Sequence, residues 1–336
     1  MAATTKRPRT LDTFFSPPPT KKARVENLKF EISDGNVKRE HISVAPTAFS
    51  QHSTYPFAVP HLPSSIAETL NFAPADEGRT INDQPDLDLI YYQPYVAKDI
   101  EKNLFEFLRS ELFFYRVKYT IKRGTAETLI NTPRYTTVFG LDETGRFDDG
   151  GRVVDAMTKK PIGQTAYRCR PRPIPECLDS LRRLTEATTG CQFNFCLVNY
   201  YASGNDSISY HSDDERFLGL EPAIASFSLG AKRDFLLKHK PTPAKHESEK
   251  KPTKLPLASG DMVLMRGKTQ SSWLHSIPKR TGKGNEAEKG RINITFRRAM
   301  VKGGTENYYR YNVGEGEVYK WDAGRREMVV WKKEQG

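Results

Sequence analysis

The segment Asn199–Glu215 reads NYYASGNDSISYHSDDE and places a histidine and a carboxylate two residues apart, at His211 and Asp213. Side chains two residues apart on an extended strand leave the same face, so this pair points to a common place. His275, in the later segment WLH, is our candidate for a third ligand. Two histidines and a carboxylate on one face, with other coordination positions open, are the ligand set of non-haem Fe(II) sites. An HxD pair alone is weak evidence, because a histidine at a strand end is usually structural or faces solvent.

The segment Arg291–Arg297 reads RINITFR and alternates strictly between polar and apolar residues. Its polar face carries Arg291, Asn293, Thr295 and Arg297. An ordinary half-buried strand with a solvated face explains this pattern. In the alternative interpretation, the polar face lines a cavity. Its two arginines would then suit a dicarboxylate, because a guanidinium binds a carboxylate through two hydrogen bonds and stays charged. Asn199 and Tyr201, again two residues apart, would add hydrogen bonds from a neighbouring strand.

The rest of the chain predicts a mainly β fold with flanking helices. Residues 89–92 and 135–139 are typical of strands, and apolar residues recur at helical spacing over 97–114 and 175–189. From Phe193 onward, short strands alternate with turns. Two helices followed by many short strands favour a β-sandwich or jelly roll with helical support.

The composition is that of a basic protein, in which 52 Lys and Arg residues against 41 Asp and Glu residues give a formal charge of +11. Positive charge makes nucleic acid a reasonable partner. No apolar run approaches the ~20 residues that span a bilayer, so we expect no membrane association. Four cysteines without a CxxC pair exclude a disulfide scaffold and argue against a cysteine-bound zinc. We expect an intracellular monomer.

Three regions are expected along the chain. Residues 1–85 are predicted to form a disordered basic tail, because they are rich in Ser, Thr and Pro without a sustained helical or strand period. Residues 86–300 are predicted to form the folded core. Residues 301–336, which include Tyr308 and Tyr309, are predicted to be a β-rich extension packed on that core.

Three motifs occur in the order found in the AlkB family of Fe(II)/2-oxoglutarate dioxygenases, which the chain resembles. They are HSDDE at 211–215, LHSIP at 274–278 and RINITFR at 291–297. Two further segments strengthen the resemblance, FNFCLVNYY at 193–201 and PRYTTVFG at 133–140. The resemblance covers about residues 87–299 and points to the eukaryotic nucleic-acid repair branch.

The resemblance implies a double-stranded β-helix (jelly roll) core in which His211, Asp213 and His275 bind Fe(II). Arg297 would bind the distal carboxylate of 2-oxoglutarate. The rest of that pocket would be formed by Arg291, Asn293, Thr295, Asn199 and Tyr201. With O2, an enzyme of this family oxidatively demethylates N-alkylated DNA bases such as 1-methyladenine and 3-methylcytosine. The products are formaldehyde, succinate and CO2.

The resemblance also implies a substrate site. A base inside a duplex cannot reach a buried metal, so the target must be flipped out or already single-stranded. Arg134 and Tyr135 would belong to a nucleotide-recognition lid, and Tyr167 would stack on the base. Asp214 and Glu215 would read its exocyclic amine and favour its positive charge. Solvated carboxylates at a strand end are the alternative for these two residues.

The segment Lys122–Asn131 lacks the aromatic finger with which duplex-acting relatives fill the gap left by a flipped base. Single-stranded alkylated DNA is therefore at least as good a candidate as double-stranded DNA, and no feature excludes RNA. An RNA demethylase of the same chemistry, a protein hydroxylase and a non-catalytic nucleic-acid-binding adaptor are the alternatives. The intact ligand set argues against the adaptor, because binding alone gains nothing from a redox metal site.

The tail carries two short motifs. TLDTFF, at Thr10–Phe15, resembles the motif by which replication proteins bind the sliding clamp, although Pro8 stands where a glutamine is usual. The contacts would be made by Leu11, Phe14 and Phe15. A chance apolar cluster is the alternative. KKAR, at Lys21–Arg24, resembles a nuclear-import signal. Together the motifs predict a nuclear protein that binds the replication clamp.

Overall fold

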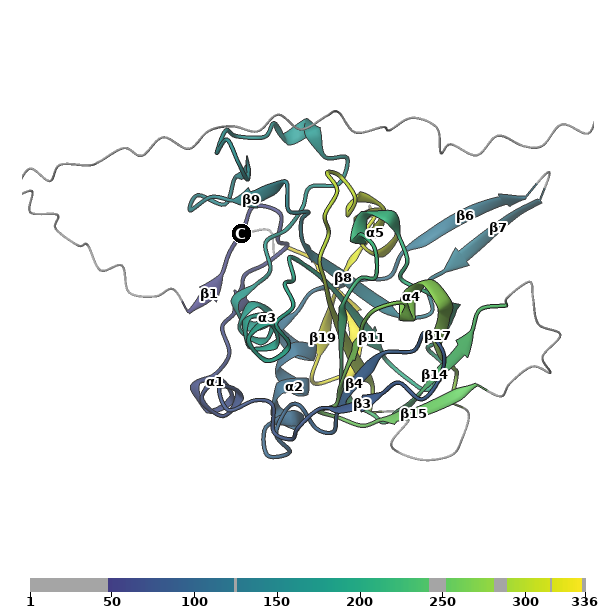
Figure 1. The fold of residues 1–336 in the computed structure, drawn as a ribbon. Helices are drawn as coiled ribbons and strands as arrows, with labels where there is room; N and C mark the ends of the chain where they lie inside the picture. The colour runs from purple at the N-terminus through teal and green to yellow at the C-terminus, as the bar shows by residue number, and fades with distance from the viewer. Residues whose placement is uncertain (1–47, 124–125, 242–251, 281–288, 315, 334–336) are drawn as a thin grey trace, which may run out of the picture. The chain divides into compact units, whose positions relative to one another are not determined.

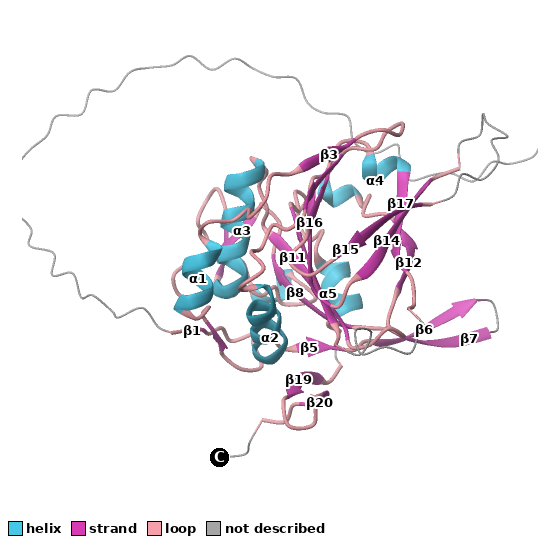
Figure 2. Cartoon of the chain, turned by 90° about the horizontal axis from the view of Figure 1, so that it is seen from below, coloured by secondary structure: helices cyan, strands magenta, loops and turns pink. Residues whose placement is uncertain are grey.

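Two β-sheets form the centre of the fold (Figure 1). The computed structural model describes residues 48–123, 126–241, 252–280, 289–314 and 316–333. On one side of the larger sheet lie α1 (Ser64–Leu70), α2 (Glu101–Glu111) and α3 (Glu176–Thr189), and on its other side lies the smaller sheet (Figure 2). This arrangement confirms the predicted mainly β class with flanking helices. Within the described residues, no helix combines the length and apolar character needed to cross a bilayer.

The larger sheet has ten antiparallel strands. Their spatial order is β20 (Glu327–Val330), β19 (Val318–Asp322), β5 (Phe114–Tyr115), β8 (Tyr135–Gly140), β11 (Phe195–Tyr201), β18 (Arg291–Arg297), β13 (Ile224–Gly230), β16 (Met262–Met265), β4 (Leu89–Tyr92) and β3 (Arg79–Ile81). The smaller sheet is also antiparallel. Its order is β12 (Ile208–His211), β17 (Trp273–Ile277), β14 (Arg233–His239) and β15 (Thr253–Leu257).

Short elements complete the fold. Two more helices are α4 (Thr269–Ser272) and α5 (Glu306–Asn312), and two 3-10 turns are η1 (Gln164–Ala166) and η2 (Arg216–Leu218). Three two-stranded pairs are β1 (Phe49–Ser50) with β2 (Val59–Pro60), β6 (Lys118–Arg123) with β7 (Ala126–Asn131), and β9 (Gly145–Phe147) with β10 (Val153–Asp155).

Strand β18 runs through the middle of the larger sheet and is buried on both faces. Ile292, Ile294 and Phe296 belong to the same core cluster as Leu104 of α2 and Leu181 of α3. The four polar side chains of β18 are also buried, and they line a cavity. The solvated-face interpretation of this strand is therefore wrong, and the cavity interpretation is confirmed.

Helix α3 begins after Pro175 and ends at Gly190, as its sequence predicts. Proline fits the start of a helix because its fixed φ suits the chain entering the first turn. Gly190 has a φ of 68°, and glycine accepts this left-handed conformation without the clash of a Cβ atom. Cys177 and Leu178 lie on the buried face, so the amphipathic pattern matches the packing.

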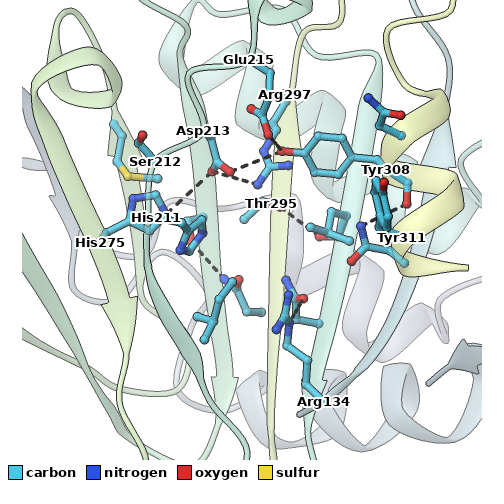
Figure 3. Close-up of a pocket in the computed structure, with 18 of the residues that line it drawn as sticks. Arg134, His211, Ser212, Asp213, Glu215, His275, Thr295, Arg297, Tyr308 and Tyr311 are labelled. Atoms are coloured by element: carbon cyan, nitrogen blue, oxygen red, sulfur yellow. Dashed lines mark hydrogen bonds and ion pairs between the residues drawn. The ribbon is translucent and has the colours of Figure 1, made fainter. Parts of the chain in front are cut away.

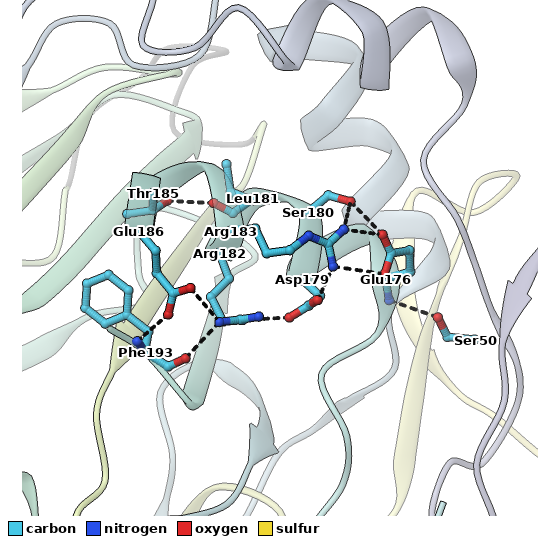
Figure 4. Close-up of polar contacts among 10 residues, drawn as sticks. All are labelled: Ser50, Glu176, Asp179, Ser180, Leu181, Arg182, Arg183, Thr185, Glu186 and Phe193. Carbon is cyan, nitrogen blue, oxygen red and sulfur yellow. Dashed lines mark hydrogen bonds and ion pairs between the residues drawn. The ribbon is translucent and has the colours of Figure 1, made fainter. Parts of the chain in front are cut away.

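Polar contacts join α3 to the chain that leads into β11 (Figure 4). Arg182 donates to Asp179 Oδ1 at 2.6 Å and to the backbone carbonyl of Phe193 at 3.1 Å. Glu186 Oε1 accepts from the backbone N–H of Phe193 at 2.6 Å. Arg183, the next residue, pairs with carboxylates of its own helix only. The two neighbouring arginines therefore differ in that only Arg182 links two elements.

The predicted tail boundary is wrong, because residues 48–85 are folded. They form β1, β2, α1 and β3, and they bury Val59, Ile66 and Leu70 in the core. These elements are two to seven residues long, too short to leave a periodic pattern in the sequence. The clamp and nuclear-import motifs lie in residues 1–47, outside the described residues.

The C-terminal region is β-rich only in part. Strand β19 joins the edge of the larger sheet beside β5, as predicted, and β20 pairs with β19. Tyr308 and Tyr309, however, lie in helix α5 and not in a strand. Tyr309 is buried and donates to the Gly140 carbonyl at 2.7 Å, which fixes the helix against β8. The sequence does not predict this helix, because two adjacent tyrosines are compatible with either a helical or an extended backbone.

We predict that Arg182→Ala lowers the free energy of unfolding by about 2 kcal/mol, because it leaves the Phe193 carbonyl and the Glu186 carboxylate without their charged donor. Arg183→Ala is the matched control and should cost below about 1 kcal/mol. Its side chain is 50% exposed, against 19% for Arg182. Urea denaturation of both variants measures the difference, and equal losses would show that the link to β11 adds nothing.

Candidate active site

A cavity of about 830 Å³ lies between the two sheets. Strands of the larger sheet, strands of the smaller sheet and helix α5 all contribute to its wall (Figure 3). The predicted site residues found on this wall are Arg134, Asn199, Tyr201, His211, Asp213, Glu215, His275, Arg291, Asn293, Thr295 and Arg297. Residues predicted from separate motifs therefore meet in one place.

The two histidines face each other because β12 and β17 are paired antiparallel with His211 opposite His275. Their ring centroids are 4.2 Å apart. Asp213 follows β12 by two residues and turns its carboxylate to the same point (Figure 3). One ligand atom from each of the three residues lies within 4.8 Å of the others. It is the only such cluster of three or more His, Cys, Asp or Glu residues in the described part of the chain.

The protonation of the three side chains suits a metal. The carbonyl of Ser209 accepts a hydrogen bond from His211 Nδ1 at 2.9 Å, which leaves the Nε2 lone pair for a ligand. Burial lowers the pKa of His275 to about 3, so this imidazole is neutral. Burial opposes ionisation of Asp213, but Arg297, the two histidines and the Tyr308 hydroxyl together outweigh it and lower the pKa of the carboxyl. Two imidazoles and one carboxylate are a donor set that fits Fe(II).

Asp213 is held from three sides. Arg297 Nη2 donates to its Oδ2 at 2.9 Å, Gln270 Oε1 accepts from its backbone N–H at 2.9 Å, and the Tyr308 hydroxyl lies 3.4 Å from Oδ1. Sequence reasoning missed Gln270 and Tyr308. The first is an ordinary polar residue in a four-residue helix, and the second lies beyond the motifs of the resemblance. Aromatic spacing in the C-terminal region was the only signal for Tyr308.

Tyr308 also connects Glu215 to this network. Its hydroxyl donates to Glu215 Oε1 at 2.6 Å, and the guanidinium of Arg297 lies 4.9 Å from the centre of its ring. Burial, helped by the nearby charge of Asp213, raises the pKa of Glu215. Glu215 Oε2 is buried and has no hydrogen-bond partner among the described residues. The second oxygen of this carboxyl is therefore available to a ligand.

The two arginines of β18 have different surroundings. Arg297 is paired with the candidate metal ligand Asp213. Arg291, six residues earlier on the same strand, donates from Nη2 to Ser228 Oγ at 2.7 Å and lies 5.2 Å from the ring centre of Tyr201. Nε and Nη1 of both arginines are buried without a partner in the described regions. Burial lowers the pKa of Arg291 to about 10, so the side chain is still cationic at neutral pH. A buried cation with free donors fits a carboxylate.

The remaining polar residues of the predicted pocket are cross-strand neighbours. Asn199 is opposite Asn293 on β11 and β18, and Tyr201 is opposite Arg291. Asn293 Nδ2 donates to Ser226 Oγ at 2.9 Å, and Asn199 Oδ1 accepts from Arg134 at 2.7 Å. Thr295 also lies on the cavity wall but donates to the backbone carbonyl of Leu197. These hydrogen bonds hold the wall in shape.

Three predicted substrate residues do not line the cavity, which corrects their assignment. Tyr135, the first residue of β8, packs its ring against Tyr319 and is absent from the cavity wall. Tyr167 is buried beside Leu141 and Gly145, away from the cavity. Asp214 pairs with Lys240 at 2.6 Å on the surface, as the solvated alternative predicts.

Comparisons with known proteins give a consistent result. Residues 89–297 match the family model described as the 2OG-Fe(II) oxygenase superfamily. "DNA oxidative demethylase ALKBH2" of Bos taurus is 40% identical over 131 residues, which are 39% of this chain and 46% of that protein. The protein of the same name from Homo sapiens is 39% identical over 132 residues, 39% of this chain and 49% of its own length.

A third relative is "Alpha-ketoglutarate-dependent dioxygenase alkB homolog 3" of Rattus norvegicus, 39% identical over 138 residues, 40% of this chain and 45% of that protein. The chain spans about half the length of the curated relatives it matches. A solved structure titled "The structure of OsALKBH1" aligns with a TM-score of 0.37 and 18% identity, over 66% of this chain and 100% of that chain.

These relatives confirm the resemblance to AlkB proteins that the motifs indicated. The family model confirms the jelly-roll core and the cofactors Fe(II), 2-oxoglutarate and O2, which the donor set of the cavity fits. The matched residues make up more than half of the sequence and include all three candidate ligands, and this chain belongs to the 2OG-Fe(II) oxygenase superfamily.

Proposed function

We propose that this chain is a DNA repair dioxygenase that removes methyl groups from N-alkylated bases, using Fe(II), O2 and 2-oxoglutarate. The observation that carries the proposal is the cluster of His211, Asp213 and His275, whose ligand atoms lie within 4.8 Å of one another. The same cavity also holds a carboxylate oxygen and two arginines with unused hydrogen-bonding capacity. The names of the relatives support DNA as the substrate.

In this proposal, His211, Asp213 and His275 hold the iron. Bound Fe(II), with 2-oxoglutarate and O2, supplies the oxidant that hydroxylates an N-methyl group, after which formaldehyde leaves. The neutral imidazole of His275 and the ionised Asp213 need no proton transfer before they bind the metal. Arg297, fixed on Asp213, keeps the carboxylate in place and ionised.

We assign the distal carboxylate of 2-oxoglutarate to Arg291 in place of Arg297, which the resemblance implied. Arg297 already uses Nη2 on Asp213, beside the metal ligands. A distal carboxylate points away from the metal, toward the part of β18 where Arg291 lies. Nε and Nη1 of both arginines are buried without partners in the described residues, but only Arg291 is not paired with a candidate metal ligand, so its two donors suit a bidentate carboxylate away from the metal.

Glu215 and Arg134 are proposed to contact the damaged base. Adenine and cytosine each carry an exocyclic amine, which donates hydrogen bonds. The unpartnered Oε2 of Glu215 can accept such a bond, while Tyr308 holds the other oxygen. Methylation at N1 of adenine or N3 of cytosine leaves the base cationic, and a carboxyl group in a buried wall favours that charge. Arg134 lies on the same wall.

The chain is further proposed to act in the nucleus, bound to the sliding clamp through Leu11, Phe14 and Phe15. The basis is the sequence of the tail, in which two adjacent phenylalanines stand in otherwise polar surroundings. Single-stranded DNA is the preferred form of the substrate, because Lys122–Asn131 offers no aromatic residue to fill a gap in a duplex. RNA with the same lesion is the alternative substrate.

We predict that full-length protein given Fe(II), 2-oxoglutarate and O2 removes the methyl group from a single-stranded DNA oligonucleotide that carries one 1-methyladenine. Mass spectrometry of the oligonucleotide and a formaldehyde assay measure the reaction. His211→Ala should reduce turnover by more than about 100-fold, because even the outer partners of metal ligands contribute about 10–100-fold. His61→Ala, outside the cavity, is the matched control. If the methyl group is retained on the DNA oligonucleotide but lost from an RNA oligonucleotide with the same lesion, the RNA alternative is favoured. If neither demethylation nor succinate formation occurs, the non-catalytic adaptor is favoured.

We predict that Arg291→Gln weakens 2-oxoglutarate binding about 30-fold or more, because it removes one partner of a buried charge pair. The decisive comparison is with 2-oxovalerate, which has no distal carboxylate. Arg291→Gln should bind both keto acids equally in the presence of Mn(II), whereas Arg297→Gln should keep the preference for 2-oxoglutarate. Calorimetric titration measures both. If Arg297→Gln erased the preference instead, the assignment implied by the resemblance would be right.

We predict that a synthetic peptide of residues 5–20 binds the sliding clamp and that Phe14→Ala/Phe15→Ala abolishes the binding, because paired aromatics fill an apolar groove. Fluorescence anisotropy of the labelled peptide measures the affinity. A scrambled peptide of the same composition is the control. An intact peptide that binds no better than the scrambled one would leave the cluster as a chance feature of the tail.

A further inference from the structure

A second, larger cavity of about 1450 Å³ lies on the other side of helix α5 from the first. Its walls come from segments far apart in the sequence: the loop after β1, the start of β6, residues 168–172 and the chain from 309 to 319. Neither the motifs nor the proposed chemistry uses it. Tyr311 lines both cavities, so the two are adjacent at the rim of α5.

The second cavity is strongly basic. The basic side chains on its wall are Arg116, Lys118, Arg168, Arg170, Arg172 and Arg310, and the one acidic side chain is Glu317. Such an excess of one charge in a concave surface concentrates the field and attracts anions. Net charge of the whole chain does not explain the clustering, because these residues come from three separate segments.

The basic residues at the floor of the cavity are held in place by hydrogen bonds, whereas those on its walls are exposed. Arg172 donates from Nε to the Thr54 carbonyl at 3.1 Å and packs over Tyr115 and Phe113, yet its Nη1 is buried without a partner in the described residues. Arg116 is shared between the Thr132 carbonyl and Asp206. The unpartnered Nη1 of Arg172 indicates that the floor of the cavity can bind a hydrogen-bond acceptor.

The walls carry charges that have no acidic partner. Arg168 and Arg170 on one side and Arg310 on the other are exposed, and none forms an ion pair with a described acid. Arg310 lies 5.5 Å from the ring centre of Tyr311, whose side chain is 46% exposed. Arginines around an exposed aromatic ring are what single-stranded nucleic acids bind, through phosphates and a stacked base.

We propose that this basic groove binds the phosphodiester backbone of the strand that flanks the base held in the first cavity. The proposal rests on the proposed nucleic-acid substrate and adds to it a path for the strand, from the first cavity past Tyr311 and between Arg170 and Arg310. An acidic peptide is less suited, because the groove continues into a cavity that fits a base. The groove would serve DNA and RNA alike, since it reads phosphate.

The test is binding of an undamaged 15-nucleotide single strand, without iron or 2-oxoglutarate, measured by fluorescence anisotropy at several salt concentrations. Arg170→Gln/Arg310→Gln removes one charge from each wall. Each lost phosphate contact on a single strand lowers the slope of log affinity against log salt by about 0.7, so the double variant should lose about 1.4. At 0.1 M salt this corresponds to about 25-fold weaker binding.

Lys98→Gln/Lys102→Gln is the matched control, because it removes two exposed charges from the start of α2, away from both cavities. It should change the affinity by less than about twofold. Unchanged affinity and slope in the groove variant would overturn the proposal. Displacement of the strand by poly-glutamate as readily as by a phosphodiester polymer would overturn it in favour of an acidic peptide.

A second readout separates this proposal from the proposed function. On a methylated 15-nucleotide strand, the groove variant should raise KM without changing kcat, whereas on a methylated trinucleotide both constants should equal those of the unmodified chain. Weaker binding by the groove variant, without demethylation by either protein, would support the groove and contradict the proposed function. Demethylation with equal KM for both proteins would support the proposed function and contradict the groove.

Discussion

The buried ion pair between Arg297 and Asp213 is the interaction on which the rest of the candidate site depends. It joins β18 of the larger sheet to the chain that leaves β12 of the smaller one, and both side chains are nearly inaccessible. Removing one partner of such a pair leaves an uncompensated charge, at a cost of about 3–5 kcal/mol. The same contact contributes to the lowered pKa of Asp213 and holds one oxygen of its carboxylate beside the two histidines. The pair therefore couples the packing of the two sheets to the position of one of the three candidate ligands.

Helix α5 connects the candidate site to the neighbouring basic groove. Tyr308 reaches inward to Glu215 and Asp213, Tyr309 anchors the helix to β8, and Arg310 and Tyr311 face the neighbouring groove. Seven residues thus form the wall between the two cavities. A strand of nucleic acid bound there would place its base on one side of the helix and its backbone on the other.

The sequence predicts the centre of this molecule better than its edges, for physical reasons. The alternation of β18 and the HxD spacing correctly predict which side chains line the cavity, because the period of a strand determines which side chains share a face. The assignment of Tyr135 is wrong because its ring packs against Tyr319 from the C-terminal region, a contact that no local pattern reveals. Residues 48–85 and helix α5 escape prediction because short elements are held by tertiary contacts, such as those of Val59 and Tyr309, and not by a local pattern.

The candidate metal ligands and the two arginines belong to different sheets, so a motion that separates the sheets affects them differently. His211, Asp213 and His275 all belong to the smaller sheet or its flanking chain, whereas Arg291 and Arg297 belong to the larger one. A fluctuation that parts the sheets would leave the histidines aligned by the β12–β17 pairing while carrying both guanidiniums away. With the residue roles proposed above, such a half-open molecule would keep its two histidines paired while losing the arginine that selects the dicarboxylate. Packing between the sheets, and not pairing within the smaller sheet, would then set the selectivity for the co-substrate.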